Sequence, residues 1–267
     1  MCPPNTPPDK ILKDLGISTP EDIDIEAIAQ YCHATVIPQK LHGSAARILG
    51  FGNHAFITVD SGSSRPRQRF SAAHELGHWM LDRGKLANFV CTEKNFINDW
   101  NFDNPERRAN RYAANLLMPQ FIFQPLAKDK EITFRTVIDL CKKFETSITA
   151  TAIRLVELGS FPAIVVCNNK KGRLWAYRGN DVPNVIQIRE SPSGYTDAYD
   201  LLHGKVSSAS PGETQASDWI THSRSRNYSI HEDSIKINDE LVLSLLWWKN
   251  EKQLLDLDED DEEEYQY

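Results

Sequence analysis

Two patterns predict that this chain has an α+β fold. Between residues 20 and 158, apolar residues recur at three- and four-residue spacings in several segments, which is typical of amphipathic helices. Residues 46–60 and 161–179 instead alternate apolar and polar side chains around Gly-Asn and Asn-Lys-Lys-Gly turns, as paired strands do. We therefore expect a small sheet and helices first, then a helical pair and a smaller, mostly-β C-terminal domain.

The composition is that of a globular protein without a membrane segment. Hydrophobic residues make up 40% and charged residues 25% of the 267 residues, and no apolar run approaches the roughly 20 residues that span a bilayer. The opening MCPPNTPPDK has no apolar segment of the kind found in secretory signals. The five cysteines are widely spaced and include no CxxC pair, as expected for reduced thiols. These features predict a cytoplasmic protein with no membrane partner.

The acidic charge is concentrated near the C-terminus. The formal net charge is −7, and residues 256–264 contain eight acids and no base, so the rest of the chain is nearly neutral. A block of like charges repels itself, and we expect residues 251–267 to be an acidic disordered tail. Before it, residues 239–249 form an apolar segment that we expect to be a strand or a short helix. The near-neutral remainder makes direct nucleic-acid binding unexpected.

The N-terminal half is expected to begin with a loose segment. Residues 1–20 open with four closely spaced prolines and predict a flexible arm. Residues 20–34 have helical spacing, and 46–60 should form the strand pair. A helix should then extend over about 67–84, followed by a loop over 85–103 that is rich in asparagine and aromatic residues.

The next helix has clear start and stop signals. Asn104 is a favourable N-cap, Pro105 suits the first helical position, and Pro119 lies just beyond the expected end. Two further helices are expected over 133–144 and 147–158.

The helix predicted over 67–84 contains the motif HExxH. His74 and His78 are four residues apart, so both imidazoles project from one face of the helix and can reach one ion. Glu75 lies about 100° around the helix, an offset that suits a base for an activated water better than a third ligand. A buried helix with two hydrogen-bonded histidines is the alternative, but it explains neither the shared face nor the position of Glu75. The motif therefore favours a catalytic zinc site.

A catalytic zinc needs a third protein ligand and an open position for water. Glu106 is the best candidate, because it lies in the first turn of its helix with Ala109 and Ala113 on the same side. These small residues would let that face lie close to the HExxH helix, where Gly77 also permits close approach. The alternative for Glu106 is simple stabilisation of a helix N-terminus. Asn110, one turn later, could accept a hydrogen bond from a ligating histidine, or could be ordinary polar surface.

Three segments, RQRFSAAHELGHWMLD, NPERRANRYAANLLMP and FETSITATAIRLVELG, resemble in order and spacing the signature segments of the ImmA/IrrE family of metallopeptidases. The resemblance implies a zincin-like domain with one Zn²⁺ per chain. By motif, it implies that His74, His78 and Glu106 are the metal ligands and that Glu75 is the catalytic acid and base. It also implies cleavage of a helix-turn-helix repressor that controls stress-response or mobile-element genes.

Together these features predict the following domain division, listed in chain order: a flexible arm (1–20), a zincin-like metallopeptidase core (21–130), a helical, helix-turn-helix-like pair completing the core (131–159), a mostly-β domain with a candidate sensory role (160–250) and an acidic disordered tail (251–267).

Two other functions stay open at the level of sequence. The first is a DNA-binding regulator that uses the helical pair over 133–158, although Arg154 is the only base on its second helix. The second is a sensor or interaction module in which the C-terminal domain receives a small-molecule or protein effector. Within the peptidase hypothesis, Glu75 transfers the proton from water to the leaving amine, and His54 is a weak candidate for stabilising the oxyanion.

Overall fold

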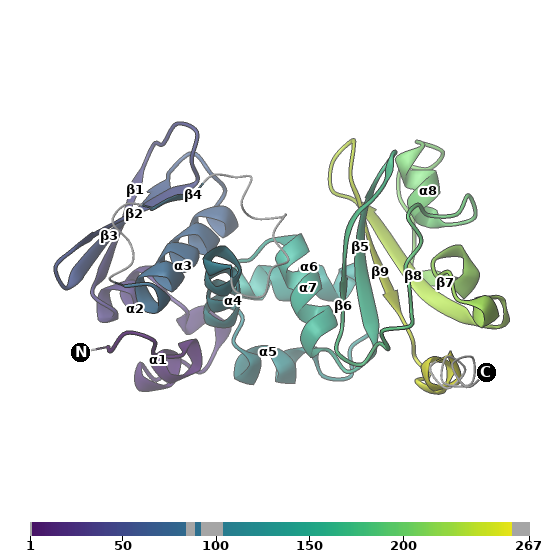
Figure 1. The fold of residues 1–267 in the computed structure, drawn as a ribbon, viewed down its shortest axis with the longest axis horizontal. Helices are drawn as coiled ribbons and strands as arrows, with labels where there is room; N and C mark the ends of the chain where they lie inside the picture. The colour runs from purple at the N-terminus through teal and green to yellow at the C-terminus, as the bar shows by residue number, and fades with distance from the viewer. Residues whose placement is uncertain (1, 84–88, 92–103, 258–267) are drawn as a thin grey trace. The chain divides into compact units, whose positions relative to one another are not determined.

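The computed structural model describes residues 2–83, 89–91 and 104–257, and the chain forms two compact units with mixed α and β structure (Figure 1). Unit 1 comprises Met1–Pro125 and Cys141–Ser147, and unit 2 comprises Leu126–Leu140 and Ile148–Tyr267. The divisions fall at residues 125/126, 140/141 and 147/148. Among the described residues, every helix is too short or too polar to cross a bilayer. The predicted α+β fold class is confirmed.

Unit 1 contains a four-stranded sheet with the order β1-β3-β2-β4. β1 pairs with β3 in parallel, and the other neighbours are antiparallel. The β2–β3 hairpin is the strand pair predicted over 46–60. Alternation places Ala55 and Ile57 in the core, where α3 packs on the sheet, and leaves Phe56 on the opposite, exposed face. The strands are β1 (Ala34–Gln39), β2 (Ala46–Phe51), β3 (His54–Asp60) and β4 (Phe89–Cys91).

The helices of unit 1 surround the core side of this sheet. α3 is buried continuously from Ser71 to Met80, and α4 packs along it. Asn104 caps α4 as predicted, because its side chain accepts a hydrogen bond from the Glu106 amide. Of the loop predicted over 85–103, only the residues of β4 are described. The helices are α1 (Pro8–Asp14), η1 (Pro20–Asp22), α2 (Ile25–Tyr31), α3 (Arg65–Leu81) and α4 (Pro105–Leu117).

The prediction of a flexible N-terminal arm is wrong for the described residues of 1–20. These residues contain α1, in which Ile11 and Leu12 are fully buried. The Asn5 amide donates to the carbonyl of Met80 over 2.8 Å, which attaches the segment to α3. The prolines misled the prediction because Pro8 occupies the first turn of α1, where proline lacks only an amide that the helix would leave unpaired.

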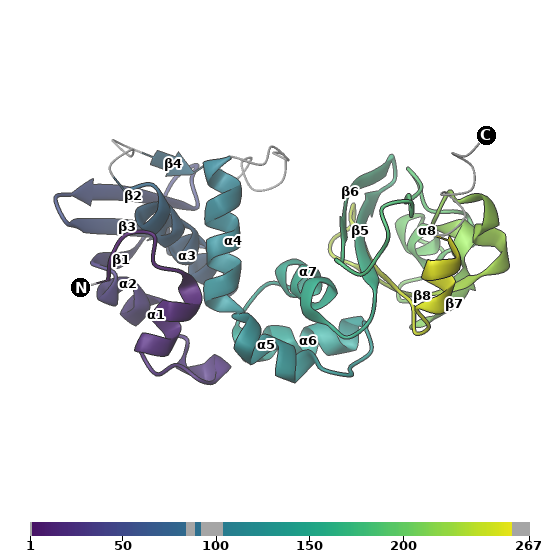
Figure 2. The same ribbon diagram turned by 60° about the horizontal axis from the view of Figure 1, so that its bottom comes forward.

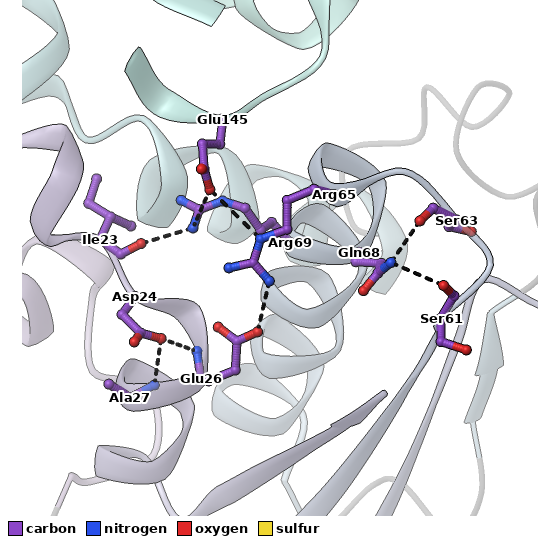
Figure 3. A network of polar contacts seen from close by, with 10 residues as sticks. All are labelled: Ile23, Asp24, Glu26, Ala27, Ser61, Ser63, Arg65, Gln68, Arg69 and Glu145. Atoms are coloured by element: carbon purple, nitrogen blue, oxygen red, sulfur yellow. Dashed lines mark hydrogen bonds and ion pairs between the residues drawn. The ribbon is translucent and has the colours of Figure 1, made fainter. Parts of the chain in front are cut away.

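The N-terminal half of α3 is held by a buried arginine (Figure 3). Arg69, which is 4% exposed, donates to the carbonyl of Ile23 over 3.0 Å and to that of Phe144 over 3.4 Å. The Glu145 carboxylate lies 3.4 Å from the same guanidinium and also pairs with Arg65 at 3.8 Å. Arg69 thus connects α3 to the segment before α2 and to the end of α6.

The remaining helices agree with the predicted pair and add one. The helix expected over 133–144 is α6, and that over 147–158 is α7, which ends before Gly159. A short helix with an internal Pro125 precedes them and was not predicted, because proline normally ends a helix. These helices are α5 (Gln120–Ala127), α6 (Phe134–Phe144) and α7 (Ile148–Leu158).

Unit 2 contains a five-stranded antiparallel sheet with the order β6-β5-β9-β8-β7. The β5–β6 hairpin is the predicted pair around Asn-Lys-Lys-Gly, and the apolar segment over 239–249 forms strand β9. One face of the sheet packs on α8 and on the buried Trp219 and Trp248. The elements are β5 (Ala163–Asn169), β6 (Gly172–Arg178), α8 (Asp197–Leu202), β7 (Gly212–Gln215), η3 (Ala216–Asp218), η4 (Ser223–Asn227), β8 (Ser229–Lys236) and β9 (Val242–Trp247).

The start of the predicted disordered tail is instead part of the fold. Residues 252–257 are helical, and Leu254 and Leu257 are buried in the core of unit 2. Two apolar residues at this spacing offset the unfavourable charge of the segment by burying their side chains. Residues 258–267 lie outside the described residues.

Candidate metal centre

α3 presents His74 and His78 to the same point in space. Residues four apart lie one above the other on a helix, and both histidines are buried, at 1% and 0% exposure. Their Nε2 atoms are 3.1 Å apart, and their rings meet edge to face. The spacing seen in the sequence therefore produces convergence of two imidazole nitrogens.

Glu106 approaches this pair from α4. Its Oε2 atom lies 3.2 Å from Nε2 of His74, and its Oε1 atom lies 3.3 Å from Nε2 of His78. Among the described residues, His74, His78 and Glu106 form a group whose ligand atoms all lie within 4.8 Å of one another. The structure thus brings together the three residues that the sequence proposes as ligands.

The approach of α4 depends on small residues at the helix contact. A Cβ atom built on Gly77 would lie 3.1 Å from the Cα and carbonyl oxygen of Ala109 and from Cβ of Tyr112. Ala109 and Ala113 are themselves fully buried. The two helices are therefore in near-backbone contact beside the metal-binding group, which is what Gly77 and the alanines of α4 suggest from the sequence.

The spacing of the donor atoms is compatible with one zinc ion. With bonds of about 2.0–2.1 Å, two ligands of a tetrahedral zinc ion are separated by about 3.3 Å. The two Nε2 atoms are 3.1 Å apart, and each lies 3.2 or 3.3 Å from a different oxygen of the Glu106 carboxylate. Both carboxylate oxygens thus face the imidazole pair, and the three residues fit a zinc site with two nitrogen ligands and one carboxylate ligand.

The protonation of the imidazoles also suits a cation. Nδ1 of His74 lies 2.9 Å from Oδ1 of Asn110, and because an amide oxygen only accepts, this nitrogen holds the ring proton. Nδ1 of His78 likewise faces Oδ2 of Asp82 at 3.4 Å. Both Nε2 atoms then direct lone pairs at each other and at a carboxylate, an arrangement that a positive ion would stabilise.

Asp82 is a site residue that the sequence reasoning did not identify. It is 4% exposed and follows His78 by one helical turn. Its Oδ1 atom lies 2.7 Å from Nη2 of Arg108 on α4, with which it forms an ion pair. The i, i+4 spacing of His78 and Asp82 was the available signal. Arg108, Asp82 and His78 form a chain of contacts between the two helices that orients the second imidazole.

Contact between Glu106 and the imidazoles shifts the pKa values of Glu106 and His78 in opposite directions. Hydrogen bonds from His74 and His78 hold the pKa of Glu106 well below its usual value. Burial lowers the pKa of His78, but the hydrogen bond and charge of Glu106 outweigh this effect, and the pKa is raised. A proton and a metal ion therefore compete for the same lone pairs.

Glu75 and His54 differ in how they relate to this centre. Glu75 is fully buried on α3, close enough to His78 for its charge to raise the imidazole pKa. His54 lies on β3 in alternation with the buried Ala55, on the face of the sheet opposite the core. Its Nε2 contacts Oγ1 of Thr35 at 2.9 Å. The structure does not bring His54 to the metal-binding group.

Two comparisons with known proteins gave matches. The model of the family described as Peptidase_M78, IrrE N-terminal-like domain, matches residues 29–156, a range that contains all three candidate ligands, Glu75, Asp82 and Asn110. A solved structure described as a Mycobacterium tuberculosis transcriptional regulator is similar in fold, with a TM-score of 0.53 at 12% identity. The similarity covers 90% of this chain and 85% of that one. No curated protein matches the chain.

Proposed function

We propose that the chain, whose residues 29–156 match the IrrE N-terminal-like peptidase domain, is a zinc-dependent endopeptidase of the ImmA/IrrE type. One observation supports the proposal above the others. Two imidazole nitrogens and a carboxylate, drawn from adjacent helices, converge to within 3.3 Å beside the buried Glu75.

Each residue has a definite task in this proposal. His74, His78 and Glu106 hold the ion, and Asn110 and Asp82 keep the two imidazoles in the required tautomer. A bound zinc ion supplies Lewis-acid chemistry, by polarising the scissile carbonyl and making water nucleophilic at neutral pH. Glu75 accepts the proton of the attacking water and delivers it to the departing amine.

The substrate that we propose is a helix-turn-helix transcriptional repressor, whose cleavage releases stress-response or mobile-element genes in the cytoplasm. The sequence resemblance to the ImmA/IrrE family supports this choice. The fold shared with a protein described as a transcriptional regulator fits a regulatory setting. We further propose that a small-molecule or protein effector binds residues 160–250 and controls cleavage.

Nothing in the second helix of the α6–α7 pair favours direct DNA binding as the main function. Arg154, the only base of α7, is 5% exposed and pairs with Glu157 at 2.7 Å. A recognition helix needs exposed groups that reach phosphates and base edges. The described α7 presents no basic group for this task.

The test is incubation of the purified protein, with and without zinc, with helix-turn-helix regulators encoded beside its gene, followed by mass spectrometry of the products. We expect zinc-dependent cleavage at a defined bond. Glu75→Gln should retain zinc and lose cleavage, whereas His78→Ala should lose both. Cleavage at the wild-type rate by Glu75→Gln would contradict the proposed mechanism.

A further inference from the structure

Two thiols from distant parts of the sequence meet in the core of unit 1. Cys2 precedes α1, and Cys32 is the C-cap of α2. Their Sγ atoms are 3.7 Å apart, and the residues are 2% and 0% exposed. Cys141, by contrast, donates its thiol to the carbonyl of Thr146. Among the described cysteines, Cys2 and Cys32 are thus in direct sulfur contact.

A partly buried arginine influences the electrostatics of the pair. The Arg83 guanidinium lies 3.9 Å over the ring of Trp79, and its Nε and Nη2 atoms are buried without a hydrogen-bond partner in the described part of the chain. Burial raises the pKa of the Cys32 thiol, while the charge of Arg83 opposes this effect. The charge of Arg83 thus lessens, without cancelling, the effect of burial on the pKa of the Cys32 thiol.

The segment that begins with Cys2 also contacts both helices of the metal centre. The Asn5 amide donates to the Met80 carbonyl at the end of α3, and the Tyr112 hydroxyl on α4 donates to the Thr6 carbonyl over 2.9 Å. In Figure 2 this segment passes over α3 before it enters α1. The indole of Trp79 donates to the Cys32 carbonyl over 3.0 Å. The thiol pair therefore lies where the N-terminal segment, α2 and α3 meet.

We propose that Cys2 and Cys32 are a redox-active dithiol, which a small-molecule disulfide such as glutathione disulfide converts to an intramolecular disulfide. The Cys2 thiolate attacks one sulfur of the oxidant, its S–S bond breaks, and one small thiol leaves. The Cys32 thiol then loses its proton and attacks Cys2 in the mixed disulfide, which releases the second small thiol. The two cysteines lose two electrons, and the oxidant gains them.

Closure requires a modest local movement. The sulfurs must approach from 3.7 Å to about 2.05 Å, the length of a disulfide bond. Cys2 can supply this movement because it lies before α1, and the backbone hydrogen bond that ties its segment to α3 is made by Asn5, three residues later. The product attaches the N-terminal segment covalently to the end of α2, so that its contacts with α3 and α4 can no longer be lost by fraying.

The experiment is a redox titration of the full chain in glutathione buffers, followed by denaturation, maleimide labelling and mapping of non-reduced peptides by mass spectrometry. The reduced chain should take five labels, one for each cysteine, and the oxidised chain three. The cross-linked peptide should join Cys2 to Cys32, and oxidation should raise the melting temperature by several degrees.

Variants separate this proposal from other oxidation events. Cys2→Ser and Cys2→Ala should lose both the cross-link and the rise in melting temperature, while Cys141→Ser should keep them. Five labels on the wild-type chain in fully oxidising buffer, or a cross-link between other cysteines, would overturn the proposal. None of these readouts depends on zinc or on peptide cleavage, so the result is independent of the proposed enzymatic function.

Discussion

Replacement of Gly77 by alanine tests whether the spacing of α3 and α4 sets the metal centre. The added Cβ would lie 3.1 Å from three atoms of α4, whereas ordinary contact begins at 3.4 Å, so the helices must separate by a few tenths of an ångström. Glu106 is on α4 and both histidines are on α3, so this separation moves the carboxylate away from the imidazoles. Metal sites keep their bond lengths within about 0.2 Å.

The expected losses in stability and in zinc affinity differ in size. Overpacking lowers the free energy of unfolding by about 1–3 kcal/mol. The higher helix propensity of alanine raises it by about 1 kcal/mol, so the variant should remain folded. Zinc affinity should fall by about tenfold to a hundredfold, the range seen when groups that support metal ligands are removed. Competition with a chromophoric chelator measures the affinity, and thermal denaturation of the metal-free protein measures the stability.

A matched control isolates the helix contact. Gly194→Ala makes the same chemical change where no atom lies within 4 Å of the new Cβ, so zinc affinity should stay at the wild-type value. If Gly77→Ala also binds zinc like the wild type, the close contact between α3 and α4 does not determine the geometry of the site, and the reasoning fails.

Three further predictions concern the groups around the ligands. Asn110→Ala and Asp82→Asn should each weaken zinc binding about 10–100-fold by releasing one imidazole, measured by the same competition, and unchanged affinity would remove their orienting role. In metal-free protein, the lowered pKa of Glu106 stabilises the fold at pH values above 4.5, its ordinary pKa, and this stabilisation is lost as pH falls through the lowered pKa. The raised pKa of His78 stabilises the fold at pH values below 6.5, its ordinary pKa, and this stabilisation is lost as pH rises through the raised pKa. The difference in melting temperature between metal-free wild type and Glu106→Gln should therefore be largest between pH 4.5 and 6.5, and a difference that increases at higher pH would contradict this assignment. Arg69→Met should lower the free energy of unfolding by about 1.5–3 kcal/mol per charged hydrogen bond lost, whereas Arg65→Met, at an exposed ion pair, should cost less than about 1 kcal/mol in the same denaturant titration.

The sequence predicted correctly the features that depend only on neighbouring residues. The cap at Asn104, the hairpin of β2 and β3, and the shared face of His74 and His78 each depend on residues within a few positions of one another. These features could be predicted because capping, alternation and helical period are short-range properties.

The features that were missed depend on tertiary contacts. The N-terminal arm is ordered because Ile11 and Leu12 meet a core built from later residues, which no pattern within residues 1–20 reveals. β1 contains Pro38 and lies at the edge of its sheet, where proline is tolerated because one side of the strand is unpaired. The i, i+4 spacing of Asp82 from His78 is a sequence signal, but the ion pair with Arg108 that holds Asp82 comes from another helix and has no local pattern.

The metal centre combines both kinds of information. The HExxH spacing fixes two ligands on one rigid helix. The third, Glu106, can reach the same ion only if α4 lies close enough to α3 for its side chain to approach the two imidazoles. Gly77 and Ala109 provide that closeness by removing side chains from the contact, and the ion pair of Arg108 with Asp82 joins the same two helices beside His78. Substitutions that alter the distance between the helices should therefore impair zinc binding as severely as loss of a group that orients a ligand, even when every ligand is retained.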